Sequence, residues 1–199
     1  MEISTELIKE IRERTGAGVL DCKKALTECA CDLEKAIEYL RKAGIAAGAK
    51  KASRVASEGL VESYIHPGSR VGSLVEVNCE TDFVARTCEF KSLVRDIAMQ
   101  VVASDPIAVS RQGVPADVLE KEKEILVAQT ASSGKPPQIL EKMIQGKLDK
   151  FYKENCLLEQ PFIKDPKRSV EEIVKEAAGK FGENIVVRRF SRFRLGQCS

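Results

Sequence analysis

An abrupt change of periodicity across residues 71–101 constrains the fold more than any other feature of this sequence. Val71, Val75 and Val77 fall on one face of a β-rich run, the pattern of a half-buried strand. After the polar step NCETDFVAR (residues 78–86), apolar residues recur at three- and four-residue spacing, which is typical of an amphipathic helix. That stripe consists of Phe90, Leu93, Val94, Ile97 and Val101. A strand that leads into a helix through one short turn predicts a sheet covered by helices.

The turn between these two elements places a large aromatic side chain at the start of the helix. Thr81 and Asp82 are natural N-cap residues, because their side-chain oxygens can accept hydrogen bonds from the unpaired first-turn amides. Phe83 follows, where the chain leaves the sheet. Physical reasoning alone leaves two interpretations open. Either Phe83 is a hydrophobic staple or core residue, or it projects from an edge of the protein.

Two further strand patterns complete the expected sheet. Residues 59–66 and 70–79 are separated by the turn sequence HPGS at 66–69, which predicts a hairpin. A last strand is expected at residues 184–195. We therefore expect an α+β fold in which an antiparallel three-stranded sheet packs against helices.

The first 50 residues carry the patterns of three short helices. Gly16 is a plausible C-terminal stop of the first helix, and Asp32 can cap the third. Three helices in so short a segment form only a marginal core on their own. The expected inward positions are Ile3, Leu7, Ile8, Ile11, Val19, Cys22, Leu26, Cys29, Leu33, Ala36, Ile37 and Leu40.

Between residues 43 and 59 the composition changes to Ala, Gly, Ser and Lys, which predicts a helical tail that fades into a linker. A boundary near residue 55 follows, with one domain at 1–54 and a second at 55–199. Lys50, Lys51 and Arg54 form a basic cluster in this stretch. An RNA-binding patch is the functional alternative, although no aromatic residue is interleaved with these charges.

Two highly charged helices are expected at residues 115–131 and 136–154, joined by the turn sequence at 131–136. Thin apolar stripes on both helices predict an inserted antiparallel hairpin at 114–154 that projects from the sheet. The alternative is that both helices pack wholly into the core. The seam of the second helix is expected to comprise Leu140, Met143 or Ile144, Lys147 or Leu148, and Phe151.

Composition argues against several classes of function. The 199 residues carry 32 basic and 30 acidic side chains, and a net charge of +2 argues against a nucleic-acid-binding domain driven by bulk charge. No stretch approaches the roughly 18 apolar residues of a membrane span. The first residues lack the basic and then apolar order of a signal peptide. We therefore expect a cytoplasmic protein without direct nucleic-acid or membrane contacts.

The sequence contains no recognisable catalytic or metal-binding constellation. It has seven cysteines and a single histidine, and no second Cys or His pair stands at zinc spacing from Cys29 and Cys31. Cys198 is expected to be exposed. Glu80 beside Cys79 would raise the pKa of that thiol, which is the wrong direction for a nucleophile. Phosphate-cradling glycine loops and serine elbows are also absent from the sequence, so we expect neither an enzyme nor a cofactor or metal site.

Several segments of the chain resemble the elongation factor Ts family. The run NCETDFVAR at 78–86 resembles one signature of that family, and RERTGAG at 12–18, continued by DCKKAL at 21–26, resembles the other. The similarity continues through GKP at 134–136, LEQPF at 158–162 and the arginine-rich last strand. The resemblance implies a ubiquitin-associated-like helical module at 1–54, an α+β core at 55–199, and a coiled-coil arm at 114–154.

The resemblance also implies a function. Members of this family are guanine-nucleotide exchange factors, so the chain is expected to bind elongation factor Tu in its GDP-bound and nucleotide-free states. On this interpretation Phe83 is a wedge and Asp82 is the acid that helps to dislodge Mg²⁺ from the partner. Thr81 and Val84 would hold the turn and support the insertion.

The implied docking surface lies in the N-terminal module. In the family it includes an arginine before the TGAG run and two apolar residues after it, which match Arg12, Val19 and Leu20 here. The family often has a Met pair at the last two positions, so this chain departs from the pattern there. Val19 also fits the helix core by its spacing, which leaves Leu20 as the better contact candidate. Short members of the family imply a homodimer, for which an open edge strand is a reasonable interface.

Two other functions remain open from the sequence. An adaptor could use the three-helix module to bind proteins without any effect on nucleotide. An RNA-binding protein could use the last strand, where alternating Arg and Phe side chains can reach phosphates and stack on bases. The residues concerned are Arg188, Arg189, Phe190, Arg192, Phe193 and Arg194.

Overall fold

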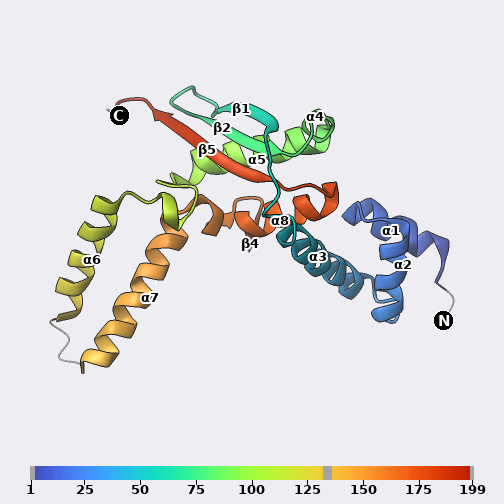
Figure 1. The fold of residues 1–199 in the computed structure, drawn as a ribbon, viewed down its shortest axis with the longest axis horizontal. Helices are drawn as coiled ribbons and strands as arrows, with labels where there is room; N and C mark the ends of the chain where they lie inside the picture. Colours follow the sequence, from blue (N-terminus) through green and yellow to red (C-terminus); the bar gives the residue numbers. More distant parts are fainter. Residues whose placement is uncertain (1–2, 132–135, 198–199) are drawn as a thin grey trace. The chain divides into compact units, whose positions relative to one another are not determined.

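The computed structural model describes residues 3–131 and 136–197 of the chain (Figure 1). Contacts between residues divide the chain into two compact units. The first comprises Met1–Gly59, Asn78–Thr87 and Glu172–Val186, and the second comprises Leu60–Val77, Cys88–Glu171 and Val187–Ser199. Each unit therefore draws together segments that are far apart in the sequence. The expected domains at 1–54 and 55–199 stay a prediction.

The first unit begins with the three expected helices, α1 (Thr5–Thr15), α2 (Val19–Glu28) and α3 (Leu33–Ala49). Gly16 ends α1 with a φ of 69°, a left-handed conformation that glycine adopts without steric cost. Asp32 caps α3 by accepting a 3.1 Å hydrogen bond from the amide of Lys35. This bond, together with the Lys35 ammonium group, lowers the pKa of the Asp32 carboxyl. The predicted helix ends are thus confirmed by their capping interactions.

A small apolar core joins the three helices. It agrees with the predicted inward faces except at Val19, whose side chain is 49% exposed. The interpretation of Val19 as helix core is therefore wrong. The buried residues of this core are Ile11, Cys22, Ala25, Leu26 and Ala36, and Ile3, Leu7, Ile8, Cys29, Leu33, Ile37 and Leu40 pack against them.

The Ala- and Gly-rich stretch that was expected to fade into a linker is helical as far as Ala49. It packs closely on α8 (Val170–Phe181), a helix that the sequence analysis did not predict. A β-carbon on Gly48 would overlap the backbone of Lys175, and a β-carbon on Gly179 would overlap the backbone of Gly44. Only glycine allows two helix backbones to approach so closely. The glycines here serve a helix crossing and not chain flexibility.

The three-stranded sheet has the order β1-β2-β5, with strands β1 (Glu58–Ile65), β2 (Val71–Cys79) and β5 (Val186–Arg194). A short turn, residues 66–70, joins the first two strands, which must therefore run antiparallel. Leu195 donates a 2.8 Å hydrogen bond to the carbonyl of Arg70, and Arg189 forms a 2.6 Å ion pair with Glu76. These partners advance in opposite directions along β2 and β5, so this pair is antiparallel as well. The predicted sheet is confirmed, although its last strand begins two residues later and ends one residue earlier than expected.

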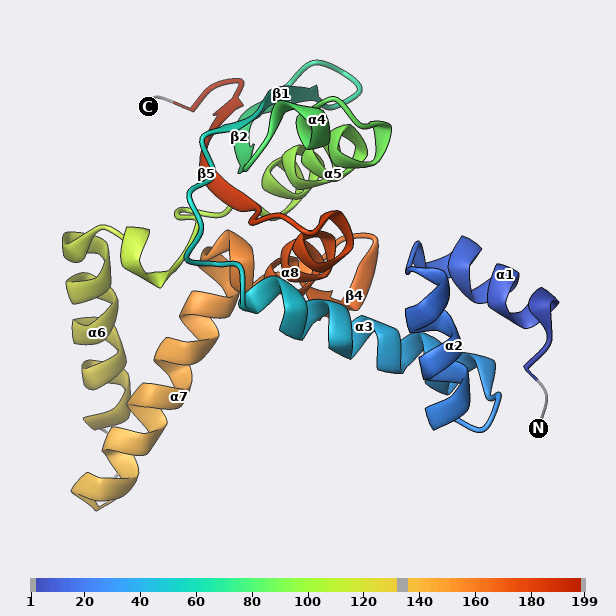
Figure 2. The same ribbon diagram turned by 45° about the vertical axis from the view of Figure 1, so that its right-hand side comes forward.

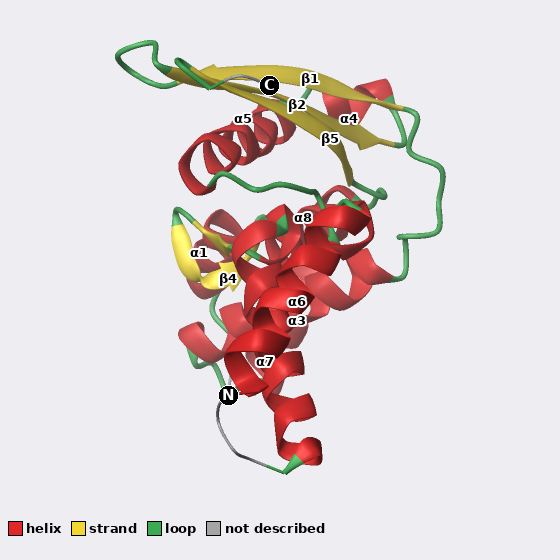
Figure 3. Ribbon diagram, turned by 90° about the vertical axis from the view of Figure 1, so that its left-hand side faces the viewer, coloured by secondary structure: helices red, strands yellow, loops and turns green. Residues whose placement is uncertain are grey.

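Helix α5 (Cys88–Ser104) lies along one face of the sheet (Figure 3). Ser73, Val75 and Val77 of β2 are buried on that face, and the hydroxyl of Ser73 donates a 2.8 Å hydrogen bond to the carbonyl of Ala98. Four of the five residues of the predicted stripe are fully buried, and Leu93 is half-buried. The change of periodicity in the sequence therefore marks a strand and the helix that covers it.

The second unit also contains the expected helical hairpin, α6 (Ala116–Ala131) and α7 (Pro137–Asn155), which run antiparallel side by side (Figures 1 and 2). The predicted turn falls mostly on residues 132–135, which lie outside the described residues. Tyr152 belongs to the seam but was missing from the prediction. The buried cluster consists of Ala108, Val114, Leu126, Leu148, Tyr152 and Cys156, with Leu119, Ile144 and Phe151 packed against it.

Arg111, in the short helix η1 (Arg111–Gly113), ties the end of α7 to the segment that follows it. Its guanidinium donates to both carboxylate oxygens of Glu159 at 2.6 and 2.7 Å and to Asp149 at 2.9 Å. It also lies 4.6 Å from the centre of the Tyr152 ring. A second, two-stranded sheet, β3 (Pro161–Phe162) and β4 (Asp165–Ser169), follows the short helix η2 (Leu157–Glu159). No helix within the described ranges is long and apolar enough to cross a membrane.

Candidate functional site

The signature segment 78–86 folds into the end of strand β2 and a single-turn helix, α4 (Asp82–Ala85). Thr81 is the N-cap, with an extended backbone and a side-chain oxygen that accepts from the amide of Val84 at 3.5 Å. The half-buried Val84 in turn accepts a 2.8 Å hydrogen bond at its carbonyl from the hydroxyl of Thr87. Capping at one end and this bond at the other close the turn. Of the two predicted N-cap residues, Thr81 is the N-cap of α4, and Asp82 is the first residue of the helix.

Phe83 projects from this turn, with 78% of its surface exposed. The interpretation of Phe83 as a core residue is therefore wrong, because a core side chain would be largely buried. The physical reason is the brevity of the helix. In a single turn only one side can pack inward, and Ala85, which is 5% exposed, takes that side. The aromatic ring at the second position of the helix is left facing outward.

Asp82 lies beside the aromatic residue and is held by an ion pair. Its carboxylate is 2.7 Å from the guanidinium of Arg86, one helical turn further on, and 42% of the Asp82 side chain is exposed. Exposed pairs of this kind contribute little to stability. The carboxylate is therefore oriented, yet accessible to a partner that approaches Phe83.

Glu183, which was not among the predicted site residues, braces the turn from a distant part of the chain. One carboxylate oxygen accepts from the backbone amides of Glu80 and Thr81, at 3.0 and 3.1 Å. The other accepts a 2.6 Å hydrogen bond from the Thr81 hydroxyl. Hydrogen bonds to an ionised acceptor are stronger than those between neutral groups. Gly182, with a φ of 75°, ends α8 immediately before Glu183 and is the one local signal of a chain reversal at this point.

Asn184, the next residue, links the same turn to the segment after α3. Its backbone amide donates a 2.6 Å hydrogen bond to the carboxylate of Glu80. Its side-chain amide donates to the carbonyls of Ala52 and Arg54 at 3.3 and 2.7 Å. Asn184 is 5% exposed, so these bonds are shielded from water. The signature turn is thus held by two consecutive residues, at positions 183 and 184.

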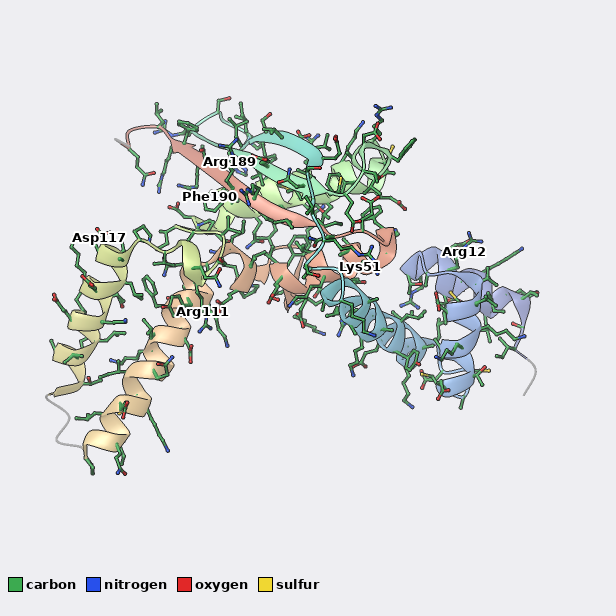
Figure 4. The ribbon with its side chains drawn as sticks, viewed as in Figure 1. Arg12, Lys51, Arg111, Asp117, Arg189 and Phe190 are labelled. Atoms are coloured by element: carbon green, nitrogen blue, oxygen red, sulfur yellow. The ribbon has the colours of Figure 1, made fainter. Side chains whose placement is uncertain are left out.

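The three expected docking residues all lie on the surface of the helical module. Arg12 on α1 is exposed (Figure 4), Val19 is 49% exposed and Leu20 is 82% exposed. Val19 and Leu20 begin α2, directly after the turn that Gly16 opens. The exposed side chains of Val19 and Leu20 are therefore accessible to another molecule. The residues of both signatures, 12–18 and 78–86, belong to the first unit, as do Val19 and Leu20.

Cys79 has the chemistry of a structural thiol. Burial raises its pKa to about 11, and the neighbouring Glu183 carboxylate adds to the rise. The direction agrees with the prediction, but the carboxylates responsible are Glu183 and, to a smaller extent, Glu58, and not Glu80. Among the described residues, no group of three or more His, Cys, Asp or Glu side chains could hold a metal ion. Cys198 lies outside the described residues.

The last strand does not present a continuous face of Arg and Phe side chains. The Arg192 side chain is only 12% exposed and pairs with Asp105 at 2.9 Å. Phe190 is half-buried, and its neighbour Arg189 pairs with Glu76 (Figure 4). Along this strand, Arg192 and Phe190 are partly buried, whereas Arg189 and Phe193 are exposed. This arrangement weighs against the RNA-binding alternative.

Comparison with known proteins identifies relatives across almost the whole chain. The family described as Elongation factor TS matches residues 5–197. Elongation factor Ts of Carboxydothermus hydrogenoformans is 60% identical over 195 residues, covering 98% of this chain and 90% of that protein. The protein of the same name from Moorella thermoacetica is 62% identical over 190 residues, covering 96% and 94%. That of Thermoanaerobacter sp. is 58% identical over 195 residues, covering 98% and 96%.

Proposed function

This chain belongs to the elongation factor Ts family of translation elongation factors, and we propose that it binds elongation factor Tu·GDP and accelerates the release of GDP so that GTP can bind. The proposal is supported by the match of residues 5–197 to the family and by the geometry of the signature turn. In this role the chain catalyses no covalent chemistry. It changes the affinity of a partner for its nucleotide.

The physical task of such a factor follows from how GTPases hold GDP. Backbone amides surround the phosphates, and Mg²⁺ bridges protein and phosphate oxygens. A factor that displaces these elements weakens nucleotide binding. By linkage, nucleotide weakens the binding of the factor to the same degree, so exchange passes through a transient ternary complex. The factor therefore needs a rigid group that can enter the partner and a separate surface that holds the partner in place.

The exposed ring of Phe83 on a braced turn is the single observation that carries the proposal. An aromatic side chain with 78% exposure is costly to leave in water unless it has a partner. Phe83 offers a large, stiff wedge with only two rotatable bonds. Asp82 beside it supplies a negative charge that can disturb the coordination of the partner's Mg²⁺. Thr81 and Val84 hold the turn in shape.

Arg12, Val19 and Leu20 form the proposed docking surface for the partner's nucleotide-binding domain. Val19 and Leu20 form an exposed apolar pair at the start of α2, and arginine is among the residue types that are enriched in binding hot spots. A docking surface that binds without perturbing nucleotide would lower the concentration of factor needed, while the wedge would set the rate. These roles can be separated by measuring exchange as a function of factor concentration.

We further propose that the chain forms a homodimer through the outer face of its sheet. This face carries an open groove of about 450 Å³ lined by residues of all three strands. Exposed apolar side chains that gather around a groove are a candidate interaction site. A second copy can cover it with the same surface, as a two-fold interface requires. The exposed apolar residues on the three strands are Val61, Ile65, Leu74 and Phe193, and the exposed Leu195 directly follows β5.

The test of the exchange function is the release of fluorescent GDP from elongation factor Tu, with and without this protein. We expect faster release, with a rate that saturates as the protein is added. A non-exchanging adaptor would bind the partner but leave the release rate unchanged, and that result would overturn the proposal. Tight, salt-sensitive binding of RNA without an effect on elongation factor Tu would instead favour the RNA-binding alternative.

A further inference from the structure

We infer that Glu183 is a positioning residue for the exchange reaction: it sets the orientation of the Phe83 wedge without touching the partner. This inference rests on the proposed function, because it assigns Glu183 a role in the action of that wedge. The carboxylate lies 102 residues from Thr81 in the sequence and yet makes three hydrogen bonds to the base of the turn.

The wedge needs such a support because α4 cannot supply it. The helix comprises only Asp82–Ala85, a single turn, and isolated turns of helix are unstable in water. Phe83 itself gains little from packing, since most of its surface is exposed. Contact between a partner and the ring would therefore displace the turn, unless Glu80 and Thr81, which precede the helix, are held in place.

The three hydrogen bonds fix those residues in a specific way. The amides of Glu80 and Thr81 are neighbours, and one carboxylate oxygen accepts from both. The second oxygen accepts from the Thr81 hydroxyl, whose oxygen also caps α4. The carboxylate thus determines both the backbone direction into the helix and the rotamer of its N-cap.

Glu183 is itself held by a rigid element. Only Gly182 separates it from Phe181, the last residue of α8. Helix α8 packs on α3 through close contacts at Gly48 and Gly179. Asn184 adds bonds from the next position to Glu80 and to the segment after α3. Glu183 and Asn184 therefore connect the turn to α3, the third helix of the module that carries Arg12, Val19 and Leu20. All of these residues belong to the first unit.

Three substitutions separate hydrogen-bond geometry from charge. Glu183→Ala removes all three acceptor contacts. Glu183→Asp keeps the charge but is shorter by one methylene, so it cannot reach the same donors. Glu183→Gln keeps the length and can still accept from both amides, while its NH₂ group donates to the Thr81 oxygen. Glu28→Ala, at an exposed glutamate on α2, is the matched control.

The readout is the GDP release rate as a function of factor concentration. For Glu183→Ala and Glu183→Asp we expect the saturating rate to fall about tenfold, with the half-saturating concentration nearly unchanged, because the docking surface is intact. Glu183→Gln and Glu28→Ala are expected to retain most of the rate. Hydrogen exchange at the amides of Glu80 and Thr81 should accelerate in the first two variants only. If instead Glu183→Asp is active and Glu183→Gln is not, the role is one of charge, and positioning is overturned.

A double-mutant cycle completes the test. Because Glu183 acts through the wedge, Glu183→Ala should cause no further loss when Phe83 is already alanine. A full additional tenfold loss in the Phe83→Ala background would overturn the positioning role and leave the exchange function standing. If the wild-type protein does not accelerate GDP release, the proposed function fails, and the positioning role fails with it.

Discussion

Gly48 of α3 lies directly against the backbone carbonyl of Lys175 in α8, with no room for a β-carbon between them. The two helices can therefore pack this closely only if residue 48 has a hydrogen atom in place of a side chain. Gly48→Ala is expected to force the helices apart and to lower the free energy of unfolding by about 1–3 kcal/mol, the usual cost of overpacking. Chemical denaturation followed by circular dichroism measures this change.

Gly44 on the same helix provides the control for this substitution. A β-carbon there would have the Glu176 side chain as its nearest neighbour, at 4.0 Å. Gly44→Ala should therefore be tolerated and should stabilise α3 by about 0.5–1 kcal/mol, because alanine loses less backbone entropy than glycine in a helix interior. Equal effects of both substitutions would show that the close crossing does not constrain the fold.

The raised pKa of Cys79 predicts that its thiol reacts slowly with alkylating reagents. With burial and Glu183 raising its pKa to about 11, the thiolate fraction at pH 8 is about 100-fold smaller than for a thiol with the ordinary pKa of 9.0. Alkylation at pH 8, mapped by mass spectrometry, should modify the exposed Cys88 long before Cys79. The folded state favours the protonated form, so its contribution to stability is complete below pH 9 and is lost as the pH rises towards 11. Similar rates at both cysteines would contradict this account.

The proposed dimer predicts the effect of a charge on the outer face of the sheet. Phe193 is 65% exposed, so Phe193→Glu should leave the fold intact but place an unpaired charge in the interface. Light scattering should give twice 21.9 kDa for the wild type and 21.9 kDa for the variant. Ile125→Glu, at a residue of α6 that is 50% exposed, is the control and should leave the dimer unchanged. A wild-type protein that is monomeric at all concentrations would contradict the proposal.

The acidic residue beside the wedge predicts a dependence on magnesium. If Asp82 acts by disturbing the Mg²⁺ site of the partner, Asp82→Asn should slow GDP release roughly tenfold when Mg²⁺ is abundant. The difference from wild type should disappear when Mg²⁺ is removed by a chelator, because no ion then has to be displaced. Thr81 still caps α4 in this variant, so the turn is retained. A defect of the same size with and without Mg²⁺ would exclude this role for Asp82.

Features that depend on near neighbours in the sequence could be predicted. The caps at Gly16, Asp32 and Thr81 each involve partners within four residues. The strand and helix around the signature follow from the change of periodicity. These elements are fixed by local hydrogen bonding and by which face must be buried, so the sequence alone identifies them.

Features that depend on distant contacts could not be predicted. The stretch that contains Gly44 and Gly48 has the composition of a linker, and only the presence of α8 shows that Gly48 serves a helix crossing. Val170, Val174 and Ala178 of α8 are buried at four-residue spacing, a signal that could have revealed this helix. Glu183, in contrast, is one acid among 30, and nothing near it in the sequence identifies Thr81 as its partner. The exposure of Phe83 likewise depends on how short α4 is.

The most direct test of the exchange function compares wild type and Phe83→Ala in the release of fluorescent GDP from elongation factor Tu, with Ile125→Ala as a control for the loss of an exposed apolar side chain. The account predicts a fall of about 30-fold for Phe83→Ala, the size of a hot-spot loss of about 2 kcal/mol, with unchanged thermal stability. Ile125→Ala should match wild type. Release that is accelerated equally by wild type and Phe83→Ala would contradict the wedge, and no acceleration by wild type would contradict the function itself.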